Sequence, residues 1–273
     1  MQAVRDGWLH RMDAGVAPAQ VKEAIRGGAG ILIPNFPLDS KLMLSLLRGL
    51  GEPLAEYSRL ISDEADADKT GVNVVKLRAI DQTGDRTHHR AGELRLHTAR
   101  SWAYPRPRYF AMLMVEPGWR DSQAGFNGES LIVPWRAVLQ RIRDADPIKF
   151  DRLFSVLSET PVSFHADRVR EAVSDQPIIY SLPDARDPFD VGIRVKQDLP
   201  AVLRRLAVTE EVAAAVEYLQ TLGGEIAREK LAVLERGSLI IVDNNRWAHG
   251  RCAFEVARGD LLNPREVWSA TVS

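Results

Sequence analysis

The feature that most constrains the fold is a stretch near the C-terminus with the pattern of a tight β-hairpin. It begins with an apolar run at 238–242, continues through the polar pair Asp243-Asn244, and returns in a run that carries His249 and then Arg251. Asp and Asn favour turns because their side chains bond to nearby backbone groups, while short runs rich in Ile and Val are typical of buried strands. The pattern therefore predicts two paired strands that present an imidazole on the returning strand.

Similar short apolar runs predict that most of the chain after residue 70 is β-structure. They lie at 31–33, 72–77, 94–97, 109–115, 130–133, 162–165, 178–181, 191–196, 238–242, 247–255 and 267–272. Helices are predicted at 18–26, from the capping residue Asp39 to Gly51, and at 134–143, 147–157 and 210–230, the last with Gly223-Gly224 as a point where it could break. This arrangement predicts a mainly β fold with flanking helices, namely a β-barrel or jelly roll.

The domain organisation expected from the sequence is simple. There is no internal repeat, low-complexity tract or linker rich in Pro and Ser, so we expect one domain over 1–273. Within it we expect an N-terminal helical layer over 1–70 and a jelly-roll core over 71–273, with a helical insert at about 198–230.

Composition argues against several classes of protein. Lys and Arg total 36 against 37 Asp and Glu, and the resulting net charge of -1 argues against a polycation that binds nucleic acid polymers. Cys252 is the only cysteine, which suits a reducing cytosol, and no apolar run is long enough to span a membrane. We therefore expect a soluble cytoplasmic protein with a small-molecule partner and no membrane or nucleic acid partner; the sequence does not indicate its oligomeric state.

Two of the six histidines stand in contexts that suggest chemistry. The other four lie in polar or charged segments or at a strand end and are expected to be solvated or structural: His10, His88, His89 and His165. His97 and His249 both lie in predicted strands, where a single histidine is more often a hydrogen-bonded core residue than a ligand. The residues around these two histidines change that expectation.

The two histidines belong to a series of short motifs. In chain order these are His97-Thr98-Ala99, Gly128-Glu129-Ser130, Gly237-Ser238-Leu239, Asp243-Asn244 and His249-Gly250-Arg251. The series resembles the iron(II)- and 2-oxoglutarate-dependent oxygenases of the clavaminate synthase and taurine dioxygenase type, from about residue 90 to the C-terminus. That family has His-x-Asp/Glu, a Gly-rich turn with a hydroxyl residue, a Gly-x-Leu strand, an Asp-Asn turn and His-Gly-Arg. The resemblance implies a double-stranded β-helix core, Fe(II) held by His97 and His249, and 2-oxoglutarate as co-substrate.

Ala99 is where the sequence departs from the family pattern. Residues i and i+2 of a strand point to the same side, so His97 and position 99 are expected to face the metal together while Thr98 faces away. Two imidazoles and one carboxylate leave three positions on iron for an oxo-acid and dioxygen, and the family supplies that carboxylate at position 99. Three interpretations follow: an inactive relative without metal, a triad completed by Glu93 or Glu129, or a halogenase, since the iron halogenases of this superfamily have His-x-Ala or His-x-Gly.

Charge and volume favour the halogenase interpretation. A chloride ion would restore the negative charge of the missing carboxylate in about the same volume, and a methyl group fits beside the anion. Glu93 precedes His97 by four residues and would lie about 13 Å away along the strand. Glu129 lies in the usual place beside the hydroxyl residue and needs no special role. The sequence thus predicts a chloride site beside Ala99, with an oxygenase of unusual ligation and a non-catalytic binding protein as alternatives.

The resemblance also implies an Arg that binds the distal carboxylate of 2-oxoglutarate together with a Ser or Thr hydroxyl. Arg258 follows His249 by nine positions and Arg265 follows it by 16. We select Arg265, because it opens a predicted strand that would hold its side chain firmly, whereas Arg258 lies in an Arg-Gly-Asp turn. Ser130 is the expected hydroxyl partner, and a bidentate Arg suits a carboxylate better than Lys does. Arg251 is a further candidate at this site, with a structural hydrogen-bond donor as the alternative.

Substrate contacts are predicted from the arginines and aromatic residues near the metal motif. The segment 100–108 interleaves Arg with Trp and Tyr, a composition that suits a phosphate and a stacking base. Candidates are Trp102, Arg100, Arg194 and Trp247, each of which could instead be a core or solvated residue. The predicted function is chlorination of an unactivated aliphatic C–H of a small polar metabolite, a nucleotide monophosphate or an amino acid, with hydroxylation as the alternative reaction.

Overall fold

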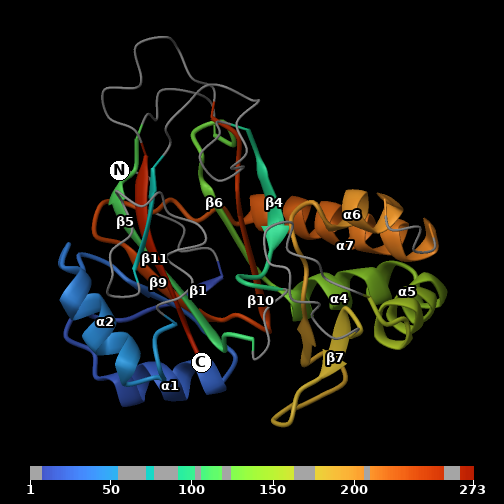
Figure 1. Cartoon of the computed structure of the whole chain (residues 1–273), viewed down its shortest axis with the longest axis horizontal. Coiled ribbons are helices and arrows are strands. Elements are labelled where there is room, and N and C mark those ends of the chain that lie inside the picture. Colours follow the sequence, from blue (N-terminus) through green and yellow to red (C-terminus); the bar gives the residue numbers. More distant parts are fainter. Residues whose placement is uncertain are drawn as a thin grey trace.

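The computed structural model describes residues 8–54, 72–76, 92–101, 106–118, 124–162, 176–205, 210–254 and 265–273 (Figure 1). The strands are β1 (Leu9–Arg11), β2 (Gly30–Ile33), β3 (Asn73–Lys76), β4 (Leu94–His97), β5 (Tyr109–Glu116), β6 (Ser130–Pro134), β7 (Ile179–Ser181), β8 (Val191–Ile193), β9 (Leu239–Asp243), β10 (Trp247–Arg251) and β11 (Glu266–Val272). The helices are α1 (Pro18–Arg26), α2 (Ser40–Arg48), α4 (Trp135–Ala145), α5 (Pro147–Glu159), α6 (Leu199–Arg205) and α7 (Glu210–Glu229).

Two sheets form the centre of the molecule. The larger sheet has the order β1-β2-β9-β5-β11-β3, and the smaller one has the order β4-β10-β6. All pairs in both sheets are antiparallel except β1 with β2. Strands far apart in sequence therefore lie side by side, as a double-stranded β-helix requires. The expected jelly-roll fold is confirmed.

Alternation along the strands separates the two faces of the larger sheet. In β5, Tyr109, Ala111 and Leu113 pack with α1 and α2 in one apolar cluster. Phe110 and Met112 point the opposite way into a second cluster, which includes Ile132 and Trp247 of the smaller sheet and which we call the inner cluster. Because successive strand residues face opposite sides, one strand serves both layers. The functional site lies on the inner side.

Helices cover the outer face of the smaller sheet. Helices α4 and α7 lie beside the smaller sheet (Figure 1). Trp135 and Val138 of α4 pack in one cluster with Leu96 of β4 and with residues of α5 and α7. Helix α7 is continuous over Glu210–Glu229, so it does not break at Gly223-Gly224, the point where the sequence left a break open. A Cβ at Gly223 would lie 2.8 Å from Leu96 Cδ1, and glycine therefore allows α7 to approach β4 closely.

The N-terminal region differs from the expectation of a helical layer that is separate from the core. Its strands β1 and β2 extend the larger sheet through pairing of Ile31 with Ile241. Helices α1 and α2 do form as predicted, and the Asp39 carboxylate accepts hydrogen bonds from the first turn of α2. None of the helices in the described ranges is long and apolar enough to cross a membrane.

Candidate metal and co-substrate site

His97 and His249 lie opposite each other on neighbouring strands. His97 ends β4, His249 is the third residue of β10, and the antiparallel pairing places the two residues directly across from one another. Their ring centroids are 4.2 Å apart with an angle of 53° between the planes. The ring of Phe110, from the larger sheet, stacks on His249 at 4.0 Å. The fold thus brings together two imidazoles that are 152 positions apart in sequence.

Both imidazoles are held in the neutral form that a metal ligand requires. Desolvation lowers the pKa of His97, and the hydrogen bond to the Arg95 carbonyl partly offsets this effect. Desolvation also lowers the pKa of His249 well below 6.5, with the charge of His97 as a second cause. His97 Nδ1 lies 2.9 Å from the Arg95 carbonyl oxygen, so Nδ1 carries the proton and Nε2 keeps its lone pair. His249 Nδ1 is buried without a hydrogen-bond partner in the described part of the chain.

Ala99 follows this pair in a rigid turn. Its side chain is 2% exposed and belongs to the inner cluster, which also contains Phe110. The Ala99 backbone N–H donates to Asn244 Oδ1 at 2.7 Å, and Asn244 Nδ2 donates to the Ala99 carbonyl at 2.9 Å. Thr98 faces the opposite way, where its hydroxyl accepts a hydrogen bond from the Val195 N–H. Asn244 therefore fixes the segment after His97 to the hairpin that carries His249.

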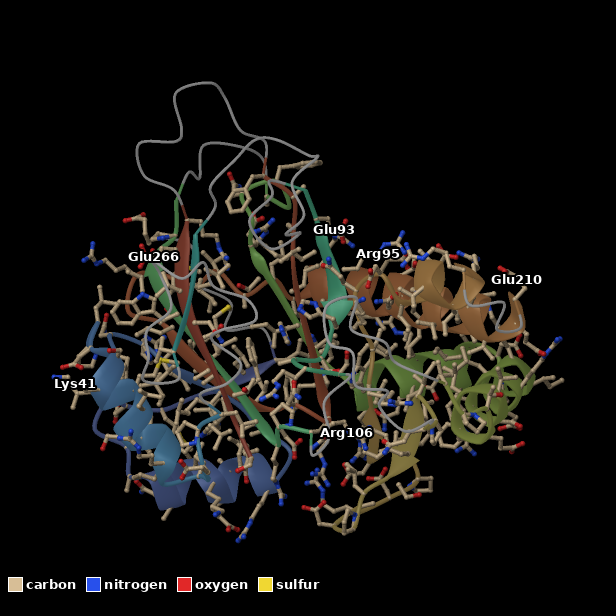
Figure 2. All side chains as sticks on the ribbon, in the orientation of Figure 1. Lys41, Glu93, Arg95, Arg106, Glu210 and Glu266 are labelled. Carbon is tan, nitrogen blue, oxygen red and sulfur yellow. The ribbon has the colours of Figure 1, made fainter. Side chains whose placement is uncertain are left out.

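Neither glutamate considered as a third ligand points to the histidines. The Glu93 carboxylate pairs with Arg228 on α7, and Figure 2 shows Glu93 toward the same end of the sheets as Glu266, with Arg106 toward the other end. The Glu129 carboxylate accepts hydrogen bonds from the Gly125 and Asn127 backbone within its own turn. Within the described ranges, no group of three or more His, Cys, Asp or Glu side chains could hold a metal ion.

A buried basic site lies next to the histidine pair. Arg251 follows His249 by two residues on β10, and it pairs across the sheet with Ser130 of β6. Arg265, just before β11, is also buried and donates to the Ser130 hydroxyl at 3.4 Å. We call Ser130, Arg251 and Arg265 the anchor site. Because residues i and i+2 share a face, it lies about 7 Å along the strand from His249, which suits an extended five-carbon diacid.

Two positive charges lie close together at the anchor site. Desolvation, together with the nearby charge of Arg265, lowers the pKa of Arg251 to about 9. A cavity of about 290 Å³ opens beside the site and is lined by Ser130, Arg265, Met114 and Leu234, among others. Gly118, with a φ of +76°, passes so close to Arg265 that a Cβ there would lie 3.0 Å from the Arg265 backbone nitrogen. Two guanidinium groups and a hydroxyl beside a cavity are groups that could bind an anion.

The residues predicted to contact substrate are mostly engaged elsewhere. Arg194 is 1% exposed, and its guanidinium donates to the backbone carbonyls of Pro177, Val162 and Gln176. Arg194 therefore links the end of β8 to the segments around Val162 and Gln176. The expectation that it contacts substrate is wrong. Trp247 is buried in the inner cluster, which is the core role that the sequence left open.

The segment after Ala99 is only partly described. Arg100 has a left-handed backbone with a φ of 47°. The Arg106 guanidinium lies 3.7 Å from the centroid of the Tyr180 ring, and Arg108 pairs with Asp184 at 2.8 Å. Several residues considered above lie outside the described ranges: Trp102, His88, His89, His165 and Arg258. His10 lies in β1 and is exposed, as expected.

The sequence did not reveal a network that supports the hairpin. Arg246, in the turn between β9 and β10, donates to the carboxylates of Asp190, Asp243 and Asp184 at 2.6, 2.8 and 2.7 Å. We call these four residues the Arg246 cluster. It ties the hairpin to the segment around β8. Its only sequence signal was an Arg within the Asp-Asn turn, since two of its partners lie far away in sequence.

The family profile described as "Taurine catabolism dioxygenase TauD, TfdA family" matches residues 9–271. The chain belongs to this family. It is thus a member of the non-haem iron, 2-oxoglutarate-dependent dioxygenase superfamily, and the resemblance inferred from the motifs is confirmed at this level. A search of curated protein sequences gives no match.

Solved structures of this TauD/TfdA type share the fold. A taurine dioxygenase from Burkholderia xenovorans has a TM-score of 0.60 at 15% identity, with 98% of this chain and 88% of that chain covered. Asparagine oxygenase in complex with Fe(II), 2S,3S-3-hydroxyasparagine and succinate has a TM-score of 0.59 at 18% identity, with 93% of this chain and 79% of that chain covered. A mutant of the non-heme iron oxygenase OrfP in complex with (3S)-hydroxy-L-Arg has a TM-score of 0.59 at 15% identity, with 94% of this chain and 79% of that chain covered. At these identities the similarity establishes the architecture alone.

Proposed function

We propose that this TauD/TfdA family member is an iron(II)- and 2-oxoglutarate-dependent halogenase that chlorinates an aliphatic C–H of a small polar metabolite. The observation that carries the proposal is Ala99, a buried methyl group at the position where the family places an iron-binding carboxylate. The engagement of Glu93 and Glu129 elsewhere supports it, because neither supplies the missing charge to the histidine pair.

The residues present fit the metal and its co-substrate. His97 and His249 would hold Fe(II), since both rings are neutral and lie side by side on β4 and β10. When bound, Fe(II) with 2-oxoglutarate and dioxygen supplies the oxidising power that removes hydrogen from an unactivated carbon. Arg265 and Ser130 would hold the distal carboxylate of 2-oxoglutarate, with Arg251 adding positive charge.

The role of Ala99 follows from charge and space. A divalent cation with two neutral imidazoles lacks the negative charge of the usual carboxylate, and a chloride ion restores it. Hydrogen bonds with the Asn244 side chain hold the Ala99 backbone in place. The methyl group of Ala99 is therefore fixed, and so is the space beside it in which chloride would bind. An Asp or Glu side chain at this position would fill that space and repel the anion.

Two substrate classes stay within the proposal. The arginines of 100–108 suggest a nucleotide monophosphate, although Arg108 is paired with Asp184 and Arg194 is occupied by carbonyls. The asparagine oxygenase and OrfP structures were solved with hydroxylated amino acids, which suggests a free amino acid. Hydroxylation of either substrate is the second candidate reaction, favoured by the family of the chain.

The test compares products made by the wild type and by variants at position 99. Protein, Fe(II), 2-oxoglutarate and chloride are mixed anaerobically with deoxynucleosides, their monophosphates and amino acids, then exposed to dioxygen and analysed by mass spectrometry. We expect a chlorinated product from the wild type and from the matched control Ala99→Gly, which keeps the space free. We expect none from Ala99→Asp or Ala99→Glu. Chlorination by Ala99→Glu at the wild-type rate would contradict the chloride site, and hydroxylation alone by the wild type would favour the second candidate.

A further inference from the structure

One edge of the inner face of the larger sheet is polar. Asn73 of β3 pairs across the sheet with Ser269 of β11, and Thr271 follows Ser269 by two residues. Their side chains face inward because Val75 and Val267, two residues away on the same strands, pack against the inner cluster. We call Asn73, Ser269 and Thr271 the polar edge. The inner residues of β5 and β9 beside it are apolar.

Two side chains of the polar edge are buried with no hydrogen-bond partner among the described residues. Asn73 is 0% exposed, and neither its Oδ1 nor its Nδ2 has a partner in the described part of the chain. Thr271 is 1% exposed, and its Oγ1 likewise has none there. A buried polar group left unpaired costs roughly 1–3 kcal/mol, so groups of this kind call for a partner other than the described residues.

The polar edge is next to the metal site and away from the anchor site. Thr271 pairs across the sheet with Phe110, the residue whose ring stacks on His249. Along β11 the inward positions run from Arg265 at the anchor site through Val267 to Ser269 and Thr271. A molecule on the polar edge would therefore approach the histidines from a different side than 2-oxoglutarate on the anchor site.

We infer that the polar edge binds the substrate through an uncharged group that both donates and accepts hydrogen bonds. An Asn amide presents one acceptor and one donor group, which complement the N–H and C=O edge of a carboxamide or the corresponding edge of a nucleobase. Asn, Ser and Thr carry no formal charge, so they cannot compensate a buried phosphate, carboxylate or ammonium group. This inference rests on the proposed function in that it takes the histidine pair as the reaction centre, but it does not depend on chlorination.

Binding to the anaerobic Fe(II)- and 2-oxoglutarate-loaded protein tests this inference without turnover. The probes are L-asparagine and 2′-deoxyadenosine 5′-monophosphate, each compared by calorimetry with a partner that lacks the edge, L-aspartate or 2-deoxyribose 5-phosphate. We expect one of the first two to bind roughly tenfold or more tightly than its partner, and Asn73→Leu to remove that difference. Tighter binding of L-asparagine would identify a carboxamide as the group that the polar edge binds, and tighter binding of the nucleotide would identify a nucleobase.

Thermal unfolding of the unliganded protein separates a binding role from a structural one. Thr271→Val removes a hydroxyl that has no partner in the described ranges, so the melting temperature should stay the same or rise. Thr98→Val is the matched control, because its buried hydroxyl is bonded to Val195 and its loss should lower the melting temperature. If Asn73→Leu does not fold, Thr271→Val alone tests the inference, through its affinity for the probes and its melting temperature.

The outcomes are distinct. Loss of edge-dependent binding with an unchanged or raised melting temperature supports the inference. A fall in melting temperature for Thr271→Val as large as that for Thr98→Val overturns it, because the hydroxyl then has a structural partner. Unchanged binding in the variants, or no preference for either edge-bearing probe, also overturns it and leaves ordered water as the partner. Chlorination is not measured in these experiments, so failure of the proposed function remains separate.

Discussion

The Arg246 cluster and the anchor site both bury arginine near the β9–β10 hairpin, yet their surroundings differ. Arg246 is met by Asp184, Asp190 and Asp243, whose hydrogen bonds and charges raise its pKa although burial alone would lower it. At the anchor site, burial and the charge of Arg265 lower the pKa of Arg251. Carboxylates surround the guanidinium at the first site, whereas a second guanidinium lies near it at the other.

This contrast separates stability from function. A buried guanidinium surrounded by carboxylates fixes the backbone, here the turn that presents His249 and the Asn244 side chain. Two buried guanidinium groups close together repel each other, which raises the free energy of the unliganded state. A carboxylate that binds to both offsets this repulsion. The following experiments test this distinction, from the largest expected effect to the smallest.

Arg246→Met should cause the largest loss of stability. It leaves the buried Asp243 without its cation and Asp190 with Arg186 alone, and breaking such a buried pair costs about 3–5 kcal/mol of unfolding free energy. Urea unfolding followed by circular dichroism measures this. The matched control Arg141→Met removes an exposed pair with Glu229 and should cost at most about 1 kcal/mol. Equal effects for the two variants would contradict the structural role of the Arg246 cluster.

Arg265→Met should instead act on 2-oxoglutarate. Loss of a buried partner for a carboxylate costs roughly 2–5 kcal/mol, which corresponds to at least a 30-fold weaker affinity for 2-oxoglutarate in an anaerobic titration. Iron binding should change little, because His97 and His249 remain. Arg258→Ala serves as the comparison: if it weakens 2-oxoglutarate binding more than Arg265→Met does, Arg258 is the anchor.

The Arg246 cluster should also determine how the protein responds to acid. Hydrogen bonds from Arg246 lower the pKa of Asp184, and those from Arg246 and Arg186 lower the pKa of Asp190, although its burial acts in the opposite direction. Because both folded-state pKa values lie below the unfolded value of 3.8, the unfolded chain binds more protons near that pH. The stabilisation is therefore complete above pH 3.8 and is lost as the pH falls through the folded-state values.

Urea unfolding at a series of pH values from 6 to 2 measures this effect. Asp184→Asn should flatten the acid limb only in part, because Asp184 is half-exposed and water screens its charge. Arg265→Met should leave the acid limb unchanged, since the anchor site holds guanidinium groups and a hydroxyl that do not titrate in this range. A change of slope in Arg265→Met would contradict the separation of the two sites.

Arg108→Ala should have the smallest effect on stability. Arg108 and Asp184 form a pair at 2.8 Å in which both side chains are more than 40% exposed, and such pairs contribute about 0.2–1 kcal/mol. We expect unchanged affinity for 2-oxoglutarate. The same variant examines the phosphate interpretation of 100–108: a loss of nucleotide monophosphate binding would show that Arg108 exchanges Asp184 for the phosphate.

Much of the fold could be predicted from local patterns. The alternation in β5 and β9, the Asp39 cap and the apolar stripes of α1 and α2 are encoded in neighbouring residues. The strand β1 was missed because three residues in a polar segment give no periodic signal, and the break left open in α7 took no account of the close packing of Gly223 on Leu96. Both differences arise where a contact from outside the segment overrides local preference.

For the site, the sequence by itself determined the residue types: two histidines, an alanine where an acid is usual, a hydroxyl residue and arginines near the C-terminus. Which arginine binds what was decided by the tertiary structure. Arg194, Arg246 and Arg265 are the same side chain, and only the carbonyls, carboxylates or hydroxyl brought to each one differ. The polar edge likewise depends on the pairing of β3 with β11, because a strand residue's burial and partners come from strands distant in sequence.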